Sequence, residues 1–371
     1  MSIEPYPYRR DGEWMSGKRR FMSALFGGRT DRISVATPTS FVTLEMQELT
    51  GACFPEAHRD PEKMVRLCHG AVEVLGHDAV CPTYSVVNEA AALGQEVDWG
   101  DQENLPVALT HTVQEPEDIK IPEDFLEKPS IRCVLDAIRL AKKQLGDRVA
   151  VIGKVMGVWT LLYHLHGVEQ SLMDTVLEPD KIRKFIDILM RVPILYGRAQ
   201  IQAGADCIML GDHAPRDLIR PEFVRDFLAP YQKIVIKELG CPMLHHCCGD
   251  TVDRLQYYIE AGFDCFHLDS KVDAFEARRV VGNRLSLVGN INNPGTLFLG
   301  SPEDVKAEAK RVCEAGLNII GPECAVPVRI PNANLIAITE AVLEYSREKA
   351  AKEGRSDIRA IFQNKSNVQG R

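Results

Sequence analysis

The sequence contains no long hydrophobic run and no excess of positive charge. Its apolar stretches all fall short of the roughly 20 residues that a membrane-spanning helix needs. Its first 20 residues are polar and charged, and they lack the apolar core of a secretory signal. The net charge is −8, which argues against nucleic acid or an anionic membrane surface as a partner. We therefore expect a cytoplasmic protein that binds neither of them.

The eleven cysteines lack the regular spacing of a disulfide framework, and their number is odd. In a reducing compartment such cysteines stay thiols. Most thiols of a soluble protein are small core residues. The functional question is which few of them have another role.

The chain also lacks internal repeats, low-complexity tracts and glycine- or serine-rich linkers, so nothing divides it into separate domains. Its 371 residues suffice for two average domains or for one large α/β barrel. We predict an N-terminal extension over residues 1–15, a single catalytic barrel domain over 16–350 and a loosely ordered tail over 351–371. The segment from Glu96 to Pro129 is rich in proline and acidic residues, and we interpret it as a long excursion from that domain.

From Arg148 onward, short apolar runs alternate with helical stretches. The predicted strands are Val149–Val155, Cys207–Gly211, Pro242–His246, Cys265–Leu268, Leu285–Gly289 and Asn318–Ile320, with Arg32–Ala36 and Ala79–Pro82 as two earlier ones. The predicted helices are Lys181–Ala203, Pro221–Leu239, Val252–Ala261, Asp273–Val281, Pro302–Ala315 and Asn334–Ser346. Strands that alternate with helices at this spacing indicate βαβ units and a parallel sheet.

Eight predicted strands favour a closed (β/α)8 barrel, and an open doubly wound sheet is the competing interpretation. No G-x-G-x-x-G motif follows the first strand, which weakens the dinucleotide-binding version of the open sheet. In a barrel, the chemistry lies at the C-terminal ends of the strands. The polar residues at those ends are Asp212, His213, His245, His246, Cys247, Cys248, His267, Asp269, Asn290, Asn292, Glu323 and Cys324.

His246 and Cys248 stand two positions apart at the end of a predicted strand. Successive side chains of a strand point to opposite faces, so residues i and i+2 share one face. Cys324 follows the last predicted strand 76 positions after Cys248, and a barrel brings such distant strand ends round one mouth. One nitrogen and two sulfurs suit a catalytic Zn²⁺ ion with an open fourth position. These three residues are the candidate metal ligands and catalytic residues.

Simpler roles compete with this interpretation. A histidine at a strand end is commonly a hydrogen-bonded core or rim residue, and a lone cysteine such as Cys324 commonly serves packing. His245 and Cys247 have the same spacing on the opposite face, where they would point into the surrounding helices. His267 is a further candidate ligand, although a core or rim position is the commoner role for such a histidine.

Four other polar residues are candidate substrate-binding groups, and each has a structural alternative. Asp212 would orient a ligand or bind substrate, and its alternative is a helix cap before Ala214 and Pro215. Asn290 and Asn292 would offer amides to a substrate, and their alternative is the turn before Pro294. Glu89 is the fourth, and its alternative is an acidic residue in the first turn of a helix.

At these positions the sequence resembles a known family. The segment Leu244–Gly249 is similar to the L-H-x-C-G strand end of the corrinoid-dependent methyltransferases related to uroporphyrinogen decarboxylase, and its motifs are most similar to those of the methylcobalamin:coenzyme M methyltransferases. Aligning the Cys-Gly pair places the family's His-x-Cys on His246 and Cys248, and its later cysteine on Cys324. Further similar segments are Lys18–Arg32, Gly51–His58, Glu89–Gly100, Gly289–Pro294 and Gly321–Pro327, so that the resemblance covers roughly residues 15 to 348.

The resemblance implies a (β/α)8 barrel of the uroporphyrinogen decarboxylase-like type and one zinc ion on His246, Cys248 and Cys324. It also implies a methyl donor, either methylcobalamin or a methylated corrinoid protein, and a thiol acceptor such as coenzyme M. A free thiol is mostly protonated at neutral pH, whereas a thiol on zinc loses its proton and stays nucleophilic. The thiolate would attack the cobalt-bound methyl group and leave a cobalt(I) corrinoid. The additional His245 and Cys247 depart from the family motif.

Three other functions compete. Uroporphyrinogen decarboxylation uses the same fold without a metal, but residues 32–41 lack the arginine-rich Met-Arg-Gln-Ala-Gly-Arg pattern that holds the polycarboxylate substrate. A folate-using methyltransferase of the cobalamin-independent methionine synthase type shares the His-x-Cys and later cysteine, but is normally about twice as long, with a second barrel. A non-catalytic corrinoid- or metal-binding protein would have little use for an open three-ligand site.

Overall fold

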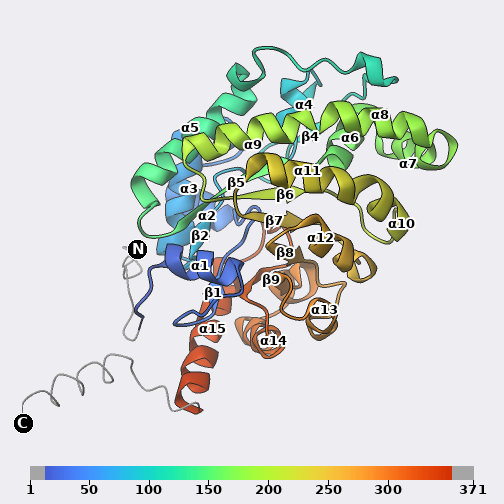
Figure 1. Ribbon diagram of the computed structural model, residues 1–371. Coiled ribbons are helices and arrows are strands. Elements are labelled where there is room, and N and C mark those ends of the chain that lie inside the picture. The colour runs from blue at the N-terminus through green and yellow to red at the C-terminus, as the bar shows by residue number, and fades with distance from the viewer. Residues whose placement is uncertain (1–12, 353–371) are drawn as a thin grey trace, which may run out of the picture.

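Eight parallel strands form a barrel in the computed structural model, which describes residues 13–352 (Figure 1). The strands are β1 (Ser34–Val35), β2 (Ala79–Val80), β5 (Ala150–Met156), β6 (Cys207–Gly211), β7 (Met243–His246), β8 (Cys265–Leu268), β9 (Ser286–Ile291) and β10 (Ile319–Pro322). Their neighbours run in the order β1-β10-β9-β8-β7-β6-β5-β2. The barrel closes between β1 and β2, where the Asp78 amide donates to the Val35 carbonyl at 2.8 Å. On the other side of β2, the Ala150 amide of β5 donates to the Asp78 carbonyl at 3.1 Å. The prediction of a (β/α)8 barrel is confirmed.

Helices surround the strands on the outside (Figure 1). They are α1 (Gly17–Leu25), α2 (Leu44–Thr50), α3 (Pro61–Glu73), α4 (Asn88–Ala92), α5 (Pro129–Leu145), α6 (Val158–His166), α7 (Val168–Leu177), α8 (Pro179–Leu189), α9 (Arg191–Ala203), α10 (Pro221–Phe223), α11 (Ala229–Leu239), α12 (Leu255–Ala261), α13 (Ala274–Val281), α14 (Pro302–Glu314) and α15 (Asn332–Lys352). None of these helices, within the described part of the chain, is long and apolar enough to cross a membrane.

Local sequence explains where these helices begin and which face they bury. In α14, the Ser301 hydroxyl accepts from the Asp304 amide and the Asp304 carboxylate accepts from the Ser301 amide, which is a capping box. In α5, the buried residues Ile131, Val134 and Ile138 recur at three- and four-residue spacing. Such faces pack onto the outer side of the barrel.

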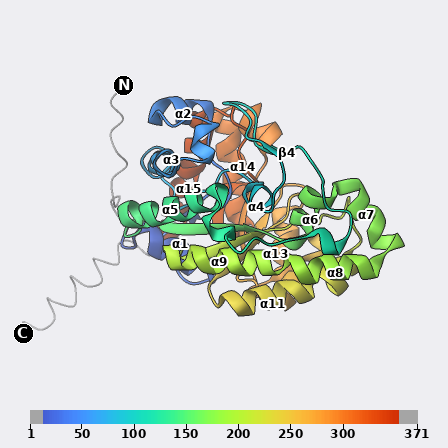
Figure 2. The same cartoon turned by 90° about the horizontal axis from the view of Figure 1, so that it is seen from above.

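The single helix predicted over Lys181–Ala203 is wrong, because the structure has α8 and α9 with a break at Met190. Pro193 explains the break. It has no amide hydrogen for the carbonyl of Leu189, and its ring crowds that carbonyl. The two helices therefore run end to end as separate elements (Figures 1 and 2).

The continuous helix predicted over Pro221–Leu239 is also interrupted. Residues Val224–Leu228 form a wide π-type turn between α10 and α11. Pro230 cannot donate to the carbonyl of Asp226, which accepts instead from Arg183 at 3.5 Å.

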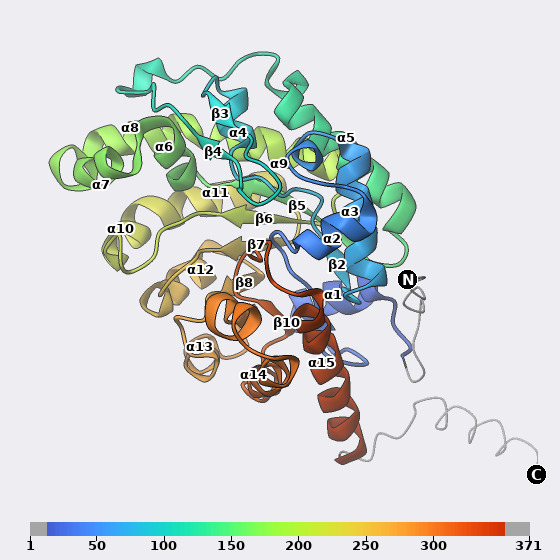
Figure 3. The same cartoon turned by 180° about the vertical axis from the view of Figure 1, so that it is seen from behind.

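The excursion between α4 and α5 lies beside α6 and α8 (Figure 3). It contains the short antiparallel pair β3 (Val97–Asp98) and β4 (Val107–Ala108). The Val113 amide donates to the Leu165 carbonyl at 3.1 Å, which ties the segment to α6. The parts of the predicted extension and tail at residues 1–12 and 353–371 lie outside the described residues.

The barrel interior is filled at the end where the strands begin. Inward side chains such as Ile152, Met209 and Val288 form one buried apolar cluster with Phe21 and Leu25 of α1. Helix α1 therefore closes the end of the barrel at which the strands begin. Within residues 13–352, the barrel therefore leaves space for chemistry at the opposite, C-terminal end of the strands.

Candidate metal centre

His246 and His245 stand at the end of β7 and point to opposite sides of it, as strand alternation requires. His246 lies level with Gly211 of β6 and His267 of β8, and it faces the barrel interior. His245 faces the helices, where its ring stacks on Phe263 with a centroid distance of 4.8 Å. The structure thus places His246, and not His245, at the mouth of the barrel.

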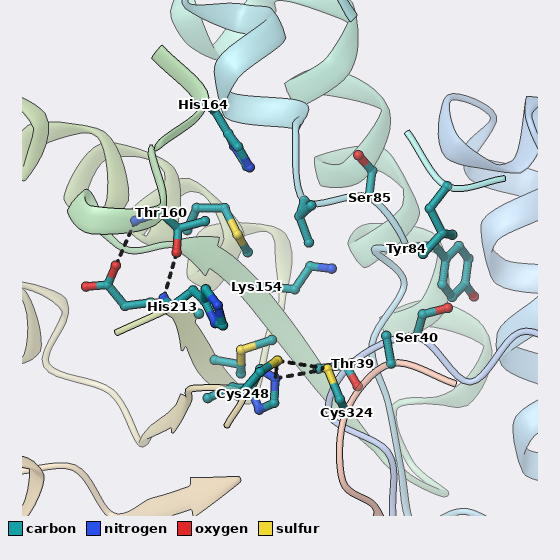
Figure 4. A pocket seen from close by; sticks show the side chains of 18 of the residues that line it. Thr39, Ser40, Tyr84, Ser85, Lys154, Thr160, His164, His213, Cys248 and Cys324 are labelled. Atoms are coloured by element: carbon teal, nitrogen blue, oxygen red, sulfur yellow. Dashed lines mark hydrogen bonds between the residues drawn. The ribbon is translucent and has the colours of Figure 1, made fainter. Parts of the chain in front are cut away.

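Three side chains that are far apart in sequence converge at this mouth (Figure 4). The Nε2 atom of His246 lies 3.0 Å from the Cys248 sulfur and 3.2 Å from the Cys324 sulfur. The two sulfurs are 3.1 Å apart. One ring nitrogen and two sulfurs that face a common point are a donor set suited to zinc, and three protein ligands leave a fourth position open.

The other ring nitrogen of His246 fixes the ring's orientation and its tautomer. It lies 3.3 Å from the His267 carbonyl oxygen, which can only accept a hydrogen bond, so Nδ1 carries the hydrogen. In the neutral ring, Nε2 then has the lone pair, and it faces the two sulfurs. His267 itself donates from Nε2 to the Pro322 carbonyl at 2.9 Å, and burial lowers its pKa to about 3. His267 is therefore a neutral core residue that supports His246.

A glycine turn directs Cys248 into the site. Gly249 has a φ of 92°, a region that glycine enters without strain, and a Cβ atom here would lie 2.7 Å from Pro215. Its amide donates to the Asp269 carboxylate at 2.7 Å. The preceding Cys247 sulfur points the other way and accepts from the Ala214 amide at 3.2 Å.

Cys324 is held by its neighbour in the chain. The Glu323 carboxylate accepts from the Asn293 amide at 2.7 Å and from the Ser270 amide at 2.9 Å. Both carboxylate oxygens thus bind backbone, and the loop after β10 is fixed against the loops after β8 and β9. The sulfur of Cys324 takes its place opposite His246 as a result.

The cluster favours a thiolate at Cys324. The hydrogen bond from the Cys248 thiol lowers the pKa of Cys324 well below its usual range, and the positive charge of a protonated His246 ring lowers it further. The same hydrogen bond raises the pKa of Cys248. The thiolate is the form of cysteine that binds a metal ion.

A cavity of about 330 Å³ opens above this cluster and has mostly apolar walls. The cluster lies at its base, together with Met156 and Met209 of the barrel strands. Its outer walls include Leu105 of the excursion and Val168 of α7, which are both partly exposed. The cavity therefore connects the candidate metal site with solvent.

Asp212 is the only one of the four predicted substrate-binding residues that lines this cavity, within the described part of the chain. Its carboxylate caps α6, and not a helix that begins at Ala214 and Pro215, because it accepts from the Thr160 amide in the first turn of α6 at 2.9 Å. The Tyr231 hydroxyl donates to its other oxygen. Burial raises the pKa of Asp212 to about 6.

The other three predicted substrate-binding residues do not line the cavity: Glu89, Asn290 and Asn292. Their polar groups form hydrogen bonds within the protein. Glu89 accepts from the Met156 amide at 2.8 Å. Asn290 donates to the Val272 carbonyl at 2.9 Å, and Asn292 accepts from the Gly295 amide at 2.6 Å. A substrate contact by any of them stays a prediction.

Lys154 is a cavity residue that the sequence analysis missed. It lies in β5, is 4% exposed and donates from Nζ to the Thr83 carbonyl at 2.8 Å. A lysine within the apolar run Ala150–Met156 was the available signal, because such strands of a parallel barrel are buried on both faces. Thr39, Ser40 and His213 also line the cavity and were not predicted as substrate-binding residues.

Comparisons with known proteins agree with this geometry. The family model described as "Uroporphyrinogen decarboxylase (URO-D)" matches residues 16–345. A methylated-thiol–coenzyme M methyltransferase of Methanosarcina mazei is 32% identical over 89% of this chain and 90% of its own length. A methylcobamide:CoM methyltransferase of Methanosarcina barkeri is 31% identical over 88% of this chain and 98% of its own. A solved methyltransferase structure from Methanosarcina mazei superposes with a TM-score of 0.86 at 30% identity, covering 89% of this chain and 99% of that one.

Proposed function

The chain belongs to the uroporphyrinogen decarboxylase (URO-D) family, and from this premise we propose that it is a zinc-dependent methyltransferase that moves a methyl group from a methylated corrinoid to a thiol. One observation carries the proposal above all. A nitrogen and two sulfurs converge at the base of a cavity, at the end of the barrel where such folds place their chemistry. The names of the relatives support methyl transfer as the reaction, and the set of one nitrogen and two sulfurs supports zinc as the metal.

The ligands would be Nε2 of His246 and the sulfurs of Cys248 and Cys324. Zinc, when bound, supplies the acidity that keeps an acceptor thiol deprotonated at neutral pH without destroying its nucleophilicity. The chain's own residues position the ligands and form the walls around the reacting sulfur. His267 and Asp269 hold the ligands in place, and the mostly apolar cavity walls surround the reacting sulfur.

The reaction forms one bond and breaks one. The thiolate sulfur of the acceptor bonds to the methyl carbon while the cobalt–carbon bond breaks, and its electron pair stays on cobalt. The products are a thioether and a cobalt(I) corrinoid, so no outside oxidant or reductant is needed. The donor is methylcobalamin or a methylated corrinoid protein, and the acceptor is a thiol such as coenzyme M, which the names of the relatives contain.

The cavity is unsuited to the decarboxylase reaction. A porphyrinogen substrate carries several carboxylates and needs several cationic partners. None of the described residues that line the cavity is an arginine, and Lys154 is its single lysine.

The test is to measure zinc content together with thiol-dependent demethylation of free methylcobalamin. Wild type should contain one zinc per chain and release cobalamin in proportion to methylated thiol. Cys324→Ala should lose most of both, because two ligands hold zinc far less tightly than three. Cys247→Ala is the matched control, since its thiol is adjacent to the site but points away from it, and it should retain both.

Two outcomes would overturn the proposal. One is a folded wild-type protein that binds no zinc when zinc is supplied. The other is a zinc-loaded protein that demethylates methylcobalamin with no thiol at all, or that decarboxylates uroporphyrinogen.

A further inference from the structure

Lys154 is a buried charged residue that shares the cavity with the candidate metal ligands. It pairs in register with Met209, whereas His246 is level with Gly211, so the lysine backbone lies one inward-facing layer below His246. Its side chain extends from there into the cavity, where Cys324 faces the same space (Figure 4). The three metal ligands alone give this lysine no role.

The Lys154 ammonium group has no carboxylate partner that offsets its burial. It has three hydrogens, and within the described part of the chain it makes one hydrogen bond, to the Thr83 carbonyl at 2.8 Å. It forms no ion pair with a carboxylate of residues 13–352. A buried cation without a counter-charge is costly, so its place in the cavity points to negative charge that arrives with a ligand.

Four ionisable groups interact with Lys154 through space. Burial raises the pKa of the Cys81 thiol and lowers the pKa of His58 to about 3, so both are neutral at pH 7. Glu89 carries only part of a charge there, because burial raises its pKa to about 7. The fourth is Cys324, which couples the lysine electrostatically to the candidate metal centre.

The net charge of that centre changes when the acceptor binds. The two positive charges of a zinc ion equal the negative charges of two cysteine thiolates, and the His246 ring adds none when it is neutral. An acceptor thiolate in the open fourth position therefore leaves one negative charge in excess. The ammonium group of Lys154 compensates it inside a cavity with mostly apolar walls, where opposite charges attract more strongly than in water.

We propose that Lys154 is a positioning residue whose charge stabilises the acceptor thiolate at the metal centre, whatever other groups the acceptor carries. This rests on the proposed function, because it takes the cluster of His246, Cys248 and Cys324 as the place where the thiol ionises. The S–H bond breaks, its electron pair stays on sulfur, and the proton leaves to solvent through the open cavity. Lys154 contributes charge and takes no part in the proton transfer.

The first experiment measures thiolate binding without a methyl donor. Co²⁺ is loaded in place of zinc, because a thiolate bound to it absorbs in the near ultraviolet, and 2-mercaptoethanol is the probe, because it has no charged group besides its sulfur. At pH 7, Lys154→Met should bind this thiol about 10- to 100-fold more weakly than wild type does. Its affinity for the metal alone should stay near that of wild type, since the centre has no net charge before the thiol binds.

The pH dependence separates a charge from a packing role. Without the ammonium group, the thiolate absorption of Lys154→Met should appear at a pH about one to two units higher than in wild type. Lys154→Arg keeps the positive charge and should stay closer to wild type. Lys143→Met removes an exposed lysine of α5 and is the control. Lys154→Gln and a circular dichroism spectrum of each variant keep the test valid if the methionine variant folds poorly.

The second experiment compares thiols in the methylcobalamin assay. The KM for 2-mercaptoethanol should rise about 10- to 100-fold in Lys154→Met, whereas kcat at saturating thiol should change far less, because the charge acts before the methyl group moves. The KM for 3-mercaptopropionate should rise by a similar factor. An effect confined to 3-mercaptopropionate would overturn the proposal, because the lysine would then bind the carboxylate and not stabilise the sulfur.

The outcomes separate this inference from the function on which it rests. A protein that demethylates methylcobalamin, but whose Lys154→Met variant has the thiol affinity and pH dependence of wild type, would overturn the role of the lysine and leave the methyltransferase intact. A wild type that binds cobalt and thiol in a Lys154-dependent way, but never demethylates methylcobalamin, would uphold the role of the lysine and overturn the function.

Discussion

Glu89 is a buried carboxyl group whose protonation changes near neutral pH. It is 3% exposed, and burial raises its pKa to about 7. The Met156 amide donates to it and Lys154 lies near enough to oppose the shift, but neither outweighs desolvation. Below pH 4.5 the carboxyl is protonated in both the folded and the unfolded chain. As pH rises from there to about 7, only the folded chain retains the proton, so stability falls and then levels off above pH 7.

We therefore expect Glu89→Gln to be more stable than wild type at pH 8 and similar to it at pH 5. Glutamine keeps an oxygen for the Met156 amide and never ionises. The gain at pH 8 is about 3 kcal/mol, because each unit of pKa shift is worth about 1.4 kcal/mol. Melting temperatures of both proteins between pH 5 and 8 measure it. The exposed Glu314→Gln is the control, and a difference between Glu89→Gln and wild type that stays constant with pH would contradict the assignment.

Individual site residues differed in how far the sequence could predict them. Strand alternation and the two-residue spacing of His246 and Cys248 were enough to propose that both side chains lie on the same face of the strand. In the structure both side chains lie next to Cys324. The depth of Lys154 could not be predicted, because a sequence does not say which layer of a barrel a long side chain reaches. Asn290 illustrates the reverse problem, because a polar residue at a strand end can form hydrogen bonds with the backbone as readily as with a substrate.

At the scale of single elements, the turn after β7 sets the direction of Cys248. We expect Gly249→Ala to cost about 1–3 kcal/mol of stability and to weaken zinc retention, because the new Cβ forces the turn away from Pro215 at a strained φ. Urea unfolding and competition with a chelator measure the two effects.

Gly240 provides the matched control for that substitution. It ends α11 with a φ of 58°, but a Cβ there would meet nothing within 4 Å. Gly240→Ala should therefore cost about 1 kcal/mol for the backbone conformation alone and leave zinc binding unchanged. Equal zinc retention in the two variants would show that the turn does not position Cys248.

Element boundaries were predictable where one local signal dominated. Apolar runs gave the strands to within a few residues, because a parallel barrel buries both faces of each strand. Helix interruptions were not predicted, since the amphipathic pattern continues through Pro193 and Pro230 and their effect depends on which carbonyl loses its donor. The two helices that were predicted whole are each divided near a proline for this reason.

At the scale of the whole molecule, one end of the barrel holds buried ion pairs and the other holds the candidate metal site. Asp78 is 2% exposed and joins the first two strands at the closed end. It accepts from Arg20 at 2.7 Å, from Arg32 at 2.9 Å, and from the Val35 amide at 3.0 Å. The candidate metal ligands all lie at the opposite ends of the strands.

This separation predicts that stability and metal binding can be uncoupled. Asp78→Asn should destabilise the fold by about 3–5 kcal/mol, because it leaves two buried guanidinium groups short of negative charge. The zinc content of the folded fraction should not change. Urea unfolding and metal analysis of the same samples test both statements, with Glu340→Gln as the control. Glu340 pairs with Lys306 at the surface, so its loss should cost less than about 1 kcal/mol. A proportionate loss of zinc in folded Asp78→Asn would mean that the two ends of the barrel are energetically coupled, and that closure between β1 and β2 helps to set the geometry of the cysteines.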